Sequence, residues 1–124
     1  MMNLVYLGLA GAAGSIARYS VGKWAATFFN SPFPYGTIIV NIAGCLLIGL
    51  LGSLFDEKNY LSPELRTPII IGFLGAFTTF SSFGYDAWLL IKNGDTLNAA
   101  YYICASFALC FVGLFCGILI AKLF

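Results

Sequence analysis

The stretch Gly72-Phe-Leu-Gly-Ala-Phe-Thr-Thr-Phe-Ser-Ser-Phe83 decides how this chain folds. It places four hydroxyl side chains and two glycines inside an apolar segment that is long enough to span a membrane. Backbone that leaves the helix inside a bilayer survives only where protein buries it or where it faces a water-filled path. We therefore expect the helix formed by this segment to be broken near its middle, and we expect the break to form part of an ion site.

The composition is typical of an integral membrane protein. Of the 124 residues, 60% are hydrophobic and 9% are charged, and a soluble domain of this size could not bury so much apolar surface. The net charge is +1 and the six basic residues are scattered, which excludes a basic patch for nucleic acid. No Lys or Arg precedes the first apolar run, so we expect a membrane span there and not a cleaved signal peptide.

Four segments are apolar and long enough to cross a bilayer as helices, namely residues 3–29, 35–55, 63–91 and 96–123. They predict an all-α membrane protein with four transmembrane helices and one domain over residues 1–124. Residues 30–34 predict a turn between the first two spans. Ser62 before Pro63 predicts the start of the third helix, and Asn93-Gly-Asp-Thr96 predicts its end and the start of the fourth.

The charged residues do not orient the chain in the membrane. Lys58, Arg66 and Lys122 fall on the side of the two termini, Lys23 and Lys92 fall on the opposite side, and Arg18 lies inside the first span. Because Lys and Arg bias near span ends sets orientation, this near balance favours insertion both ways round and antiparallel pairing of copies. Four helices leave little interior for a solvated path, so we expect the working unit to be an oligomer.

Polar residues recur on the first two spans among small ones. Arg18 shares a helical face with Gly8, Gly11, Ser15 and Gly22, and such a face is expected to pack against protein. Arg18 itself is expected to turn inward, to reach toward an interface or to be held by helix-end carbonyls. On the second span, Asn41 can donate to an anion or bond a neighbouring helix, and the sequence alone favours neither.

The last two spans carry the other candidate ion contacts. On the fourth, Tyr102, Ser106 and Cys110 lie on one face, where they line a path or bond neighbouring helices. On the third, Phe rings present electropositive edges that suit an anion, and carbonyls freed between Gly75 and Thr78 would suit a small cation. The four cysteines lack metal-ligand spacing and the chain has no His, so each is expected to pack as a small apolar residue.

Three motifs occur in order over nearly the whole chain. They are Gly11-Ala-Ala-Gly-Ser-Ile-Ala-Arg-Tyr19, Gly36-Thr-Ile-Ile-Val-Asn-Ile-Ala-Gly44 and residues 72–83. Together they resemble the fluoride channels of the CrcB (Fluc) family. The resemblance implies a passive, fluoride-selective channel of the cell membrane, formed by an antiparallel dual-topology homodimer or by a heterodimer with a related chain. It also implies two fluoride pores and a structural sodium ion at the dimer centre, between the two broken third helices.

The resemblance also implies roles for particular residues. The fluoride pathway would be lined by Asn41, Phe80, Phe83, Tyr102 and Ser106, with Ser82 and Thr79 as further hydroxyl candidates. The carbonyls of Gly75 and Thr78 correspond to the sodium ligands of the family, and Arg18 to a structural or field-shaping arginine. Two residues depart from the family pattern, since Cys110 stands where a hydroxyl is expected and Asp86 where a Glu is familiar, so the outer end of the polar track is expected to differ.

Two other functions compete with the channel. A small proton-coupled multidrug-type antiporter has a similar length, but it would need an embedded Glu in the first span, where this chain has Arg18. A non-transporting assembly subunit would use the same glycine-rich faces for packing only. We expect no enzyme, because the sequence offers no paired acids, no nucleophile with a base and no metal cluster. Passive conduction is favoured over pumping, because nucleotide-binding fingerprints are missing from the sequence.

Overall fold

The computed structural model describes residues 2–58 and 60–124, and over these residues it is helical without strands. Its elements are α1 (Met2–Phe29), α2 (Tyr35–Lys58), α3 (Pro63–Thr67), the wider π-type segment η1 (Pro68–Leu74), α4 (Gly75–Phe77), α5 (Phe80–Lys92) and α6 (Thr96–Ala121). Four helical stretches are long and apolar enough to cross a membrane: Leu4–Phe29, Tyr35–Asp56, Pro63–Lys92 and Thr96–Ala121. The predicted all-α architecture with four spans is confirmed.

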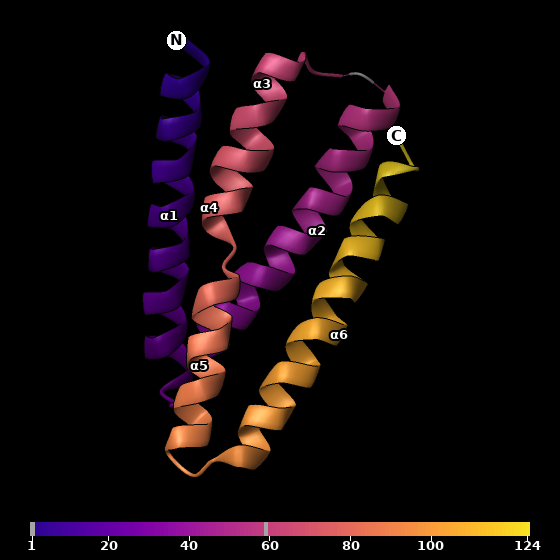
Figure 1. Cartoon of the computed structure of the whole chain (residues 1–124). Coiled ribbons are helices and arrows are strands. Elements are labelled where there is room, and N and C mark those ends of the chain that lie inside the picture. The colour runs from indigo at the N-terminus through magenta and orange to yellow at the C-terminus, as the bar shows by residue number, and fades with distance from the viewer. Residues whose placement is uncertain (1, 59) are drawn as a thin grey trace.

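The predicted turns lie where the sequence indicated. Asn30 ends α1 with a positive φ of 44°, a conformation that Asn tolerates better than most residues, and its N–H still bonds the carbonyl of Ala26 at 3.1 Å. Between α5 and α6, Gly94 adopts a φ of 81°. These two turns lie at one end of the bundle, whereas both termini lie at the other end (Figure 1).

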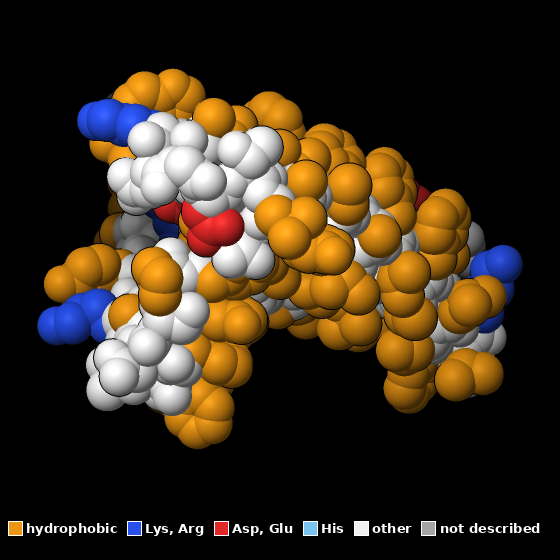
Figure 2. Space-filling view, turned by 90° about the horizontal axis from the view of Figure 1, so that it is seen from below, with side chains coloured by type: hydrophobic (Ala, Val, Ile, Leu, Met, Phe, Trp, Pro, Cys, Tyr) orange, Lys and Arg blue, Asp and Glu red, His pale blue; other side chains and the backbone are white. Residues whose placement is uncertain are grey.

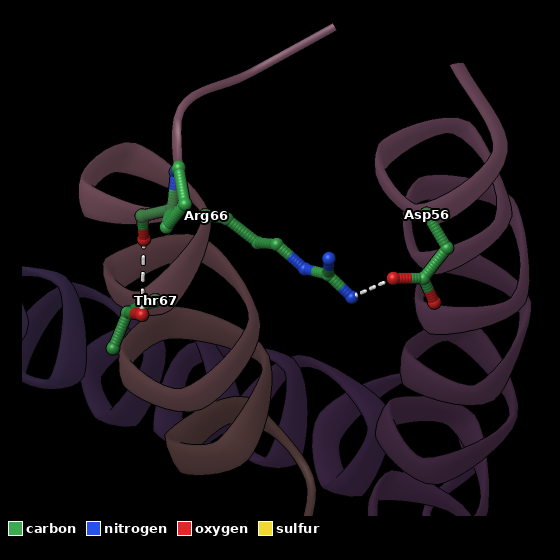
Figure 3. Close-up of polar contacts among 4 residues, drawn as sticks. Asp56, Arg66 and Thr67 are labelled. Atoms are coloured by element: carbon green, nitrogen blue, oxygen red, sulfur yellow. Dashed lines mark hydrogen bonds and ion pairs between the residues drawn. The ribbon is translucent and has the colours of Figure 1, made fainter. Parts of the chain in front are cut away.

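The third span begins at Pro63, as predicted. Ser62 precedes it in an extended conformation, but the Ser62 side chain makes no capping bond. Its carbonyl instead accepts from the N–H groups of Leu65 at 3.0 Å and Arg66 at 3.1 Å. Figure 3 shows this start of the helix, where Arg66 pairs with Asp56 at the end of α2 and the Thr67 hydroxyl bonds the carbonyl of Pro63 at 3.1 Å. Such an exposed ion pair contributes about 0–1 kcal/mol.

The third span loses helical geometry over two residues only. Thr78 (φ −87°, ψ 160°) and Thr79 (φ −156°, ψ 121°) are extended, and they separate α4 from α5, as Figure 1 shows between these two labels. The span as a whole bends by only 10°. The interruption lies at the end of the predicted region between Gly75 and Thr78, and a span broken into two separately directed halves is not established.

Glycines allow the helices to approach one another closely. On the α2–α6 seam, a Cβ at Gly49 or Gly117 would overlap backbone atoms of the facing helix, and Gly113 and Gly117 are buried. On α1, Gly14 lies directly against the backbone of Phe73. The predicted small-residue face of α1 is thus only partly used, because a Cβ at Gly8 would meet nothing within 4 Å.

Most of the apolar surface is not buried within one copy of the chain. Tyr102, Leu74 and Val40 are the largest fully buried side chains, and only 6% of the most apolar window of α1 is buried. Figure 2, seen from the end with the two turns, shows hydrophobic side chains covering most of the surface and an outline hollowed between two lobes. That surface matches the hydrocarbon core of a bilayer.

Candidate ion pathway

Asn41 bridges to the interruption of the third span from α2. Its amide nitrogen donates to the carbonyl of Thr79 at 3.0 Å, and its amide oxygen accepts from the N–H of Thr79 at 2.8 Å. Backbone groups that lose their helical partners inside a membrane need replacements, and one side chain supplies both here. The amide nitrogen has a second N–H, so Asn41 combines the interhelical bond with a remaining donor.

Hydroxyl groups cap the first turn of α5 directly after the interruption. Thr79 Oγ1 accepts from the backbone N–H of Ser82 at 3.1 Å and donates to Ser82 Oγ at 3.0 Å. Ser81 Oγ lies 3.3 Å from the same Thr79 oxygen. Thr79 therefore acts as the N-cap that α5 needs when it starts anew, a role that the Thr-Thr-Phe-Ser-Ser order could have suggested but that was not predicted for Thr79.

The carbonyls of Gly75 and Thr78 each lose the donor that a continuous helix would give them. The N–H of Thr79, four residues after Gly75, donates to Asn41, and the N–H of Ser82, four residues after Thr78, donates to Thr79 Oγ1. Carbonyl oxygens released in this way are suitable ligands for a hard cation such as sodium. The residues present therefore fit the cation that the resemblance implies.

One cavity of about 350 Å³ gathers most of the predicted site residues. Its wall is largely apolar and is formed by α2, the third span and α6. The lining residues are Asn41, Gly44, Cys45, Ile48, Ile70, Leu74, Gly75, Thr78, Thr79, Phe80, Phe83, Ser106, Phe107, Cys110 and Phe111. Residues that are far apart in the sequence thus meet around the interruption, with few polar groups facing the space.

Ser106 is a polar residue of this wall whose hydroxyl is buried without a hydrogen-bond partner among the described residues. The residue is only 5% exposed, and its hydroxyl makes no hydrogen bond with any of the described residues. A buried hydroxyl without a partner costs roughly 1–3 kcal/mol. Ser106 lines the cavity, but its oxygen is enclosed, so the hydroxyl would have to turn toward the space before it could meet a ligand or water.

The two predicted phenylalanines differ in how they are held. Phe83 is 8% exposed, and its ring centroid lies 5.2 Å from that of Tyr102 and 5.7 Å from that of Phe107. Phe80 is 75% exposed and lies 5.5 Å from Phe83 by ring centroids. Phe83 is therefore part of the core as well as of the cavity wall, whereas the ring of Phe80 is exposed and also lines the cavity.

Tyr102 lies behind the cavity and not in its wall. It is fully buried, and its hydroxyl donates to Asp86 Oδ2 at 3.3 Å. The Thr37 hydroxyl donates to the same carboxylate oxygen at 2.7 Å. Two hydroxyls thus support the acid inside the third span, as a charge or polar group in a membrane requires. Asp86 was predicted to depart from the family pattern, but its two partners were not predicted, because they come from two other helices.

Arg18 faces a second, more polar cavity of about 300 Å³. Its lining residues are Ser15, Arg18, Tyr19, Gly22, Gly36, Thr37, Val40, Thr79 and Ser82. Among the described residues Arg18 has no ion-pair partner, so its positive charge is not neutralised locally. Thr79 lines this cavity and also the first one. It therefore lies between the cavity that Arg18 lines and the largely apolar cavity.

Comparison with known families identifies the family of this chain. A family model described as "CrcB-like protein, Camphor Resistance (CrcB)" matches residues 5–118. The chain belongs to the CrcB-like family. The resemblance of the three motifs is thereby confirmed, and the CrcB-like chain with its four spans is a multi-pass protein of the cell membrane.

Several curated relatives of this CrcB-like chain carry the name "Fluoride-specific ion channel FluC". One from Rhizobium etli is 41% identical over 122 residues, which cover 98% of both chains. One from Hahella chejuensis is 40% identical over 121 residues, covering 98% of this chain and 95% of the relative. One from Chloroflexus aurantiacus is 43% identical over 106 residues, covering 86% and 84%. The family is one of channels, and the expectation that the chain is not an enzyme is confirmed.

Proposed function

We propose that this chain forms a fluoride-selective channel that lets fluoride leave the cell passively. The observation that carries the proposal is the cavity at the interruption, where Asn41, Thr79, Phe80, Phe83 and Ser106 line one wall. The buried, unpartnered hydroxyl of Ser106 supports it, as do the names of the relatives. A proton-coupled antiporter and a non-transporting subunit have no comparable support.

Fluoride holds its water tightly, so a pore must offer substitutes for that water while staying narrow. The second N–H of Asn41 would be a neutral donor of the cavity wall, and the hydroxyl of Ser106 would be another once it turns toward the space. The exposed ring of Phe80 can present its electropositive edge. Because none of these groups carries a full charge, the ion is held weakly enough to leave, as conduction requires.

The second cavity suits an entrance for anions. The unpaired charge of Arg18 there would raise the local concentration of anions, and the hydroxyls of Ser82 and Thr79 offer hydrogen bonds. An ion leaving this cavity would pass Thr79, which also lines the first one. Tyr102 would act from behind the wall, by holding Asp86 and Phe83 in place.

The working unit is proposed to be an antiparallel dual-topology homodimer with two pores. The near balance of basic residues at the two ends supports insertion in both orientations, and the unburied apolar faces leave area for a partner. The carbonyls of Gly75 and Thr78 from each copy would hold a structural sodium ion between two interrupted third spans. When bound, the cation would add a positive field to a region of low dielectric.

Fluoride efflux from liposomes tests the proposal. Liposomes containing the purified chain and loaded with fluoride are expected to release it to a fluoride electrode, whereas chloride-loaded liposomes are expected to retain chloride. Replacing sodium with a large organic cation on both sides is expected to reduce the fluoride flux. An electrode that records no fluoride release from liposomes shown to contain folded protein would contradict the channel, and equal fluoride and chloride release would contradict its selectivity.

A further inference from the structure

Two clusters of lysine and aromatic side chains are exposed at the end of the bundle that carries the two turns. In the α5 cluster, the Lys92 Nζ atom lies 5.0 Å from the centroid of the Trp88 ring, and the Trp88 ring stacks on that of Tyr85 with centroids 6.3 Å apart. In the α1 cluster, the Lys23 Nζ atom lies 5.7 Å from the centroid of the Tyr19 ring. All three rings are at least half exposed, so both clusters face the surroundings of the protein.

Both clusters lie where the apolar spans end, which is the level of the lipid headgroups in a bilayer. Lys92 is the last residue of α5, and Lys23 lies within about two helical turns of the end of α1. Trp and Tyr prefer this level because their rings combine an apolar body with a hydrogen-bond donor, and both tryptophans of the chain, Trp24 and Trp88, occur near this end. Figure 2, seen from this end, shows basic side chains projecting from the rim beside hydrophobic ones.

The two ammonium groups have no acidic partner among the described residues. The ion pair of Arg66 with Asp56 lies at the opposite end of the bundle. At the end with the turns, Asp95 accepts from the side chain of Asn98 at 2.8 Å, and Asp86 accepts from two hydroxyls. A lysine that lies over an aromatic ring without an acid beside it keeps its charge for an external anion.

We propose that the α1 and α5 clusters bind the headgroups of anionic phospholipids of the phosphatidylglycerol type. The phosphate would lie against the ammonium group, and the indole N–H of Trp88 is a donor suited to a headgroup oxygen. The acyl chains would lie along the apolar surface of the spans, most of which is not buried. Charge complementarity selects this lipid over phosphatidylcholine, whose own quaternary ammonium cancels the charge of its phosphate. Lys23, Trp88 and Lys92 line neither cavity, so this surface is separate from the proposed ion pathway.

Native mass spectrometry of protein released from nanodiscs tests the lipid site. From nanodiscs with equal amounts of phosphatidylglycerol and phosphatidylcholine, the wild type is expected to retain phosphatidylglycerol preferentially. Lys92→Ala and Lys23→Ala should each lower this preference about fivefold, the effect of one cation near an anionic surface, whereas Lys92→Arg should preserve it. Lys122→Ala is the matched control, because this exposed lysine at the opposite end has no aromatic ring beneath it among the described contacts, and it should match the wild type.

Other occupants of this surface give different results. Equal retention of the two lipids by the wild type, or an equal loss of preference in Lys92→Ala and Lys122→Ala, would overturn the proposal. Inorganic phosphate is expected to leave the retained lipid in place, and displacement by phosphate would assign the lysines to a soluble anion and overturn the lipid. The double variant Lys23→Ala/Lys92→Ala should elute from a sizing column as the wild type does; a smaller species would assign the surface to a second copy of the chain and also overturn the lipid. None of these measurements depends on ion conduction.

Discussion

The substitution Asn41→Ala tests how the interruption of the third span is maintained. It removes two hydrogen bonds to the backbone of Thr79, of 3.0 and 2.8 Å. At about 1 kcal/mol for each bond, the interrupted geometry loses about 2 kcal/mol relative to alternatives. The N–H of Thr79 would then be free to bond the carbonyl of Gly75, which continues the helix. Since 1.4 kcal/mol is a factor of ten, the ratio of the interrupted to the continuous form would fall about 30-fold.

The assay is fluoride efflux from liposomes at low protein density, so that each active unit empties one vesicle. Asn41→Ala is expected to lower the initial rate by about tenfold or more, while the protein still elutes from a sizing column as the wild type does. Asn98→Ala is the matched control, because among the described residues the exposed Asn98 side chain bonds only Asp95, near the start of α6. Its rate should stay within about twofold of the wild type. Equal rates for the two variants would refute the reasoning.

Three further predictions concern packing and charge. Phe80→Ile should suppress fluoride efflux without lowering the melting temperature, because this ring is 75% exposed and its loss removes edge electrostatics only; normal efflux would make the ring dispensable. Gly44→Ala should destabilise the fold by about 1–3 kcal/mol, because the new methyl would overlap Thr78. The control is Gly52→Ala, whose new methyl would meet nothing within 4 Å. This control should unfold at the wild-type temperature in the same calorimetric scan. Arg66→Ala should cost less than about 1 kcal/mol and leave efflux unchanged; a larger loss in thermal unfolding would mean that its pair with Asp56 is more than a surface contact.

The four spans and their turns could be predicted because hydropathy and chain breakers act locally. A run of about 20 apolar residues has few alternatives to a membrane helix, and Pro63 and Gly94 mark boundaries by backbone geometry alone. The faces of the helices were harder to predict. Gly14, and not Gly8, lies against the third span, because contact depends on which neighbour each face meets and not on spacing within one helix.

The polar residues of the site could be predicted as candidates, but their hydrogen-bond partners could not. The sequence singled out Asn41 and left open whether it bonds an anion or a helix, and the structure places it in two bonds to Thr79. The placement of Asp86 between Thr37 and Tyr102 depends on how three separate helices pack. Such long-range contacts have no signature in a single sequence. The roles proposed for these residues in conduction stay predictions.

The measurement that tests the central claim most directly is a comparison of anion release from liposomes containing the wild-type chain, loaded in parallel with fluoride and with chloride. The account predicts rapid fluoride release, no chloride release above that of protein-free liposomes, and loss of the fluoride signal in Phe80→Ile. Release of neither anion by folded wild-type protein, or release of both at similar rates, would contradict it.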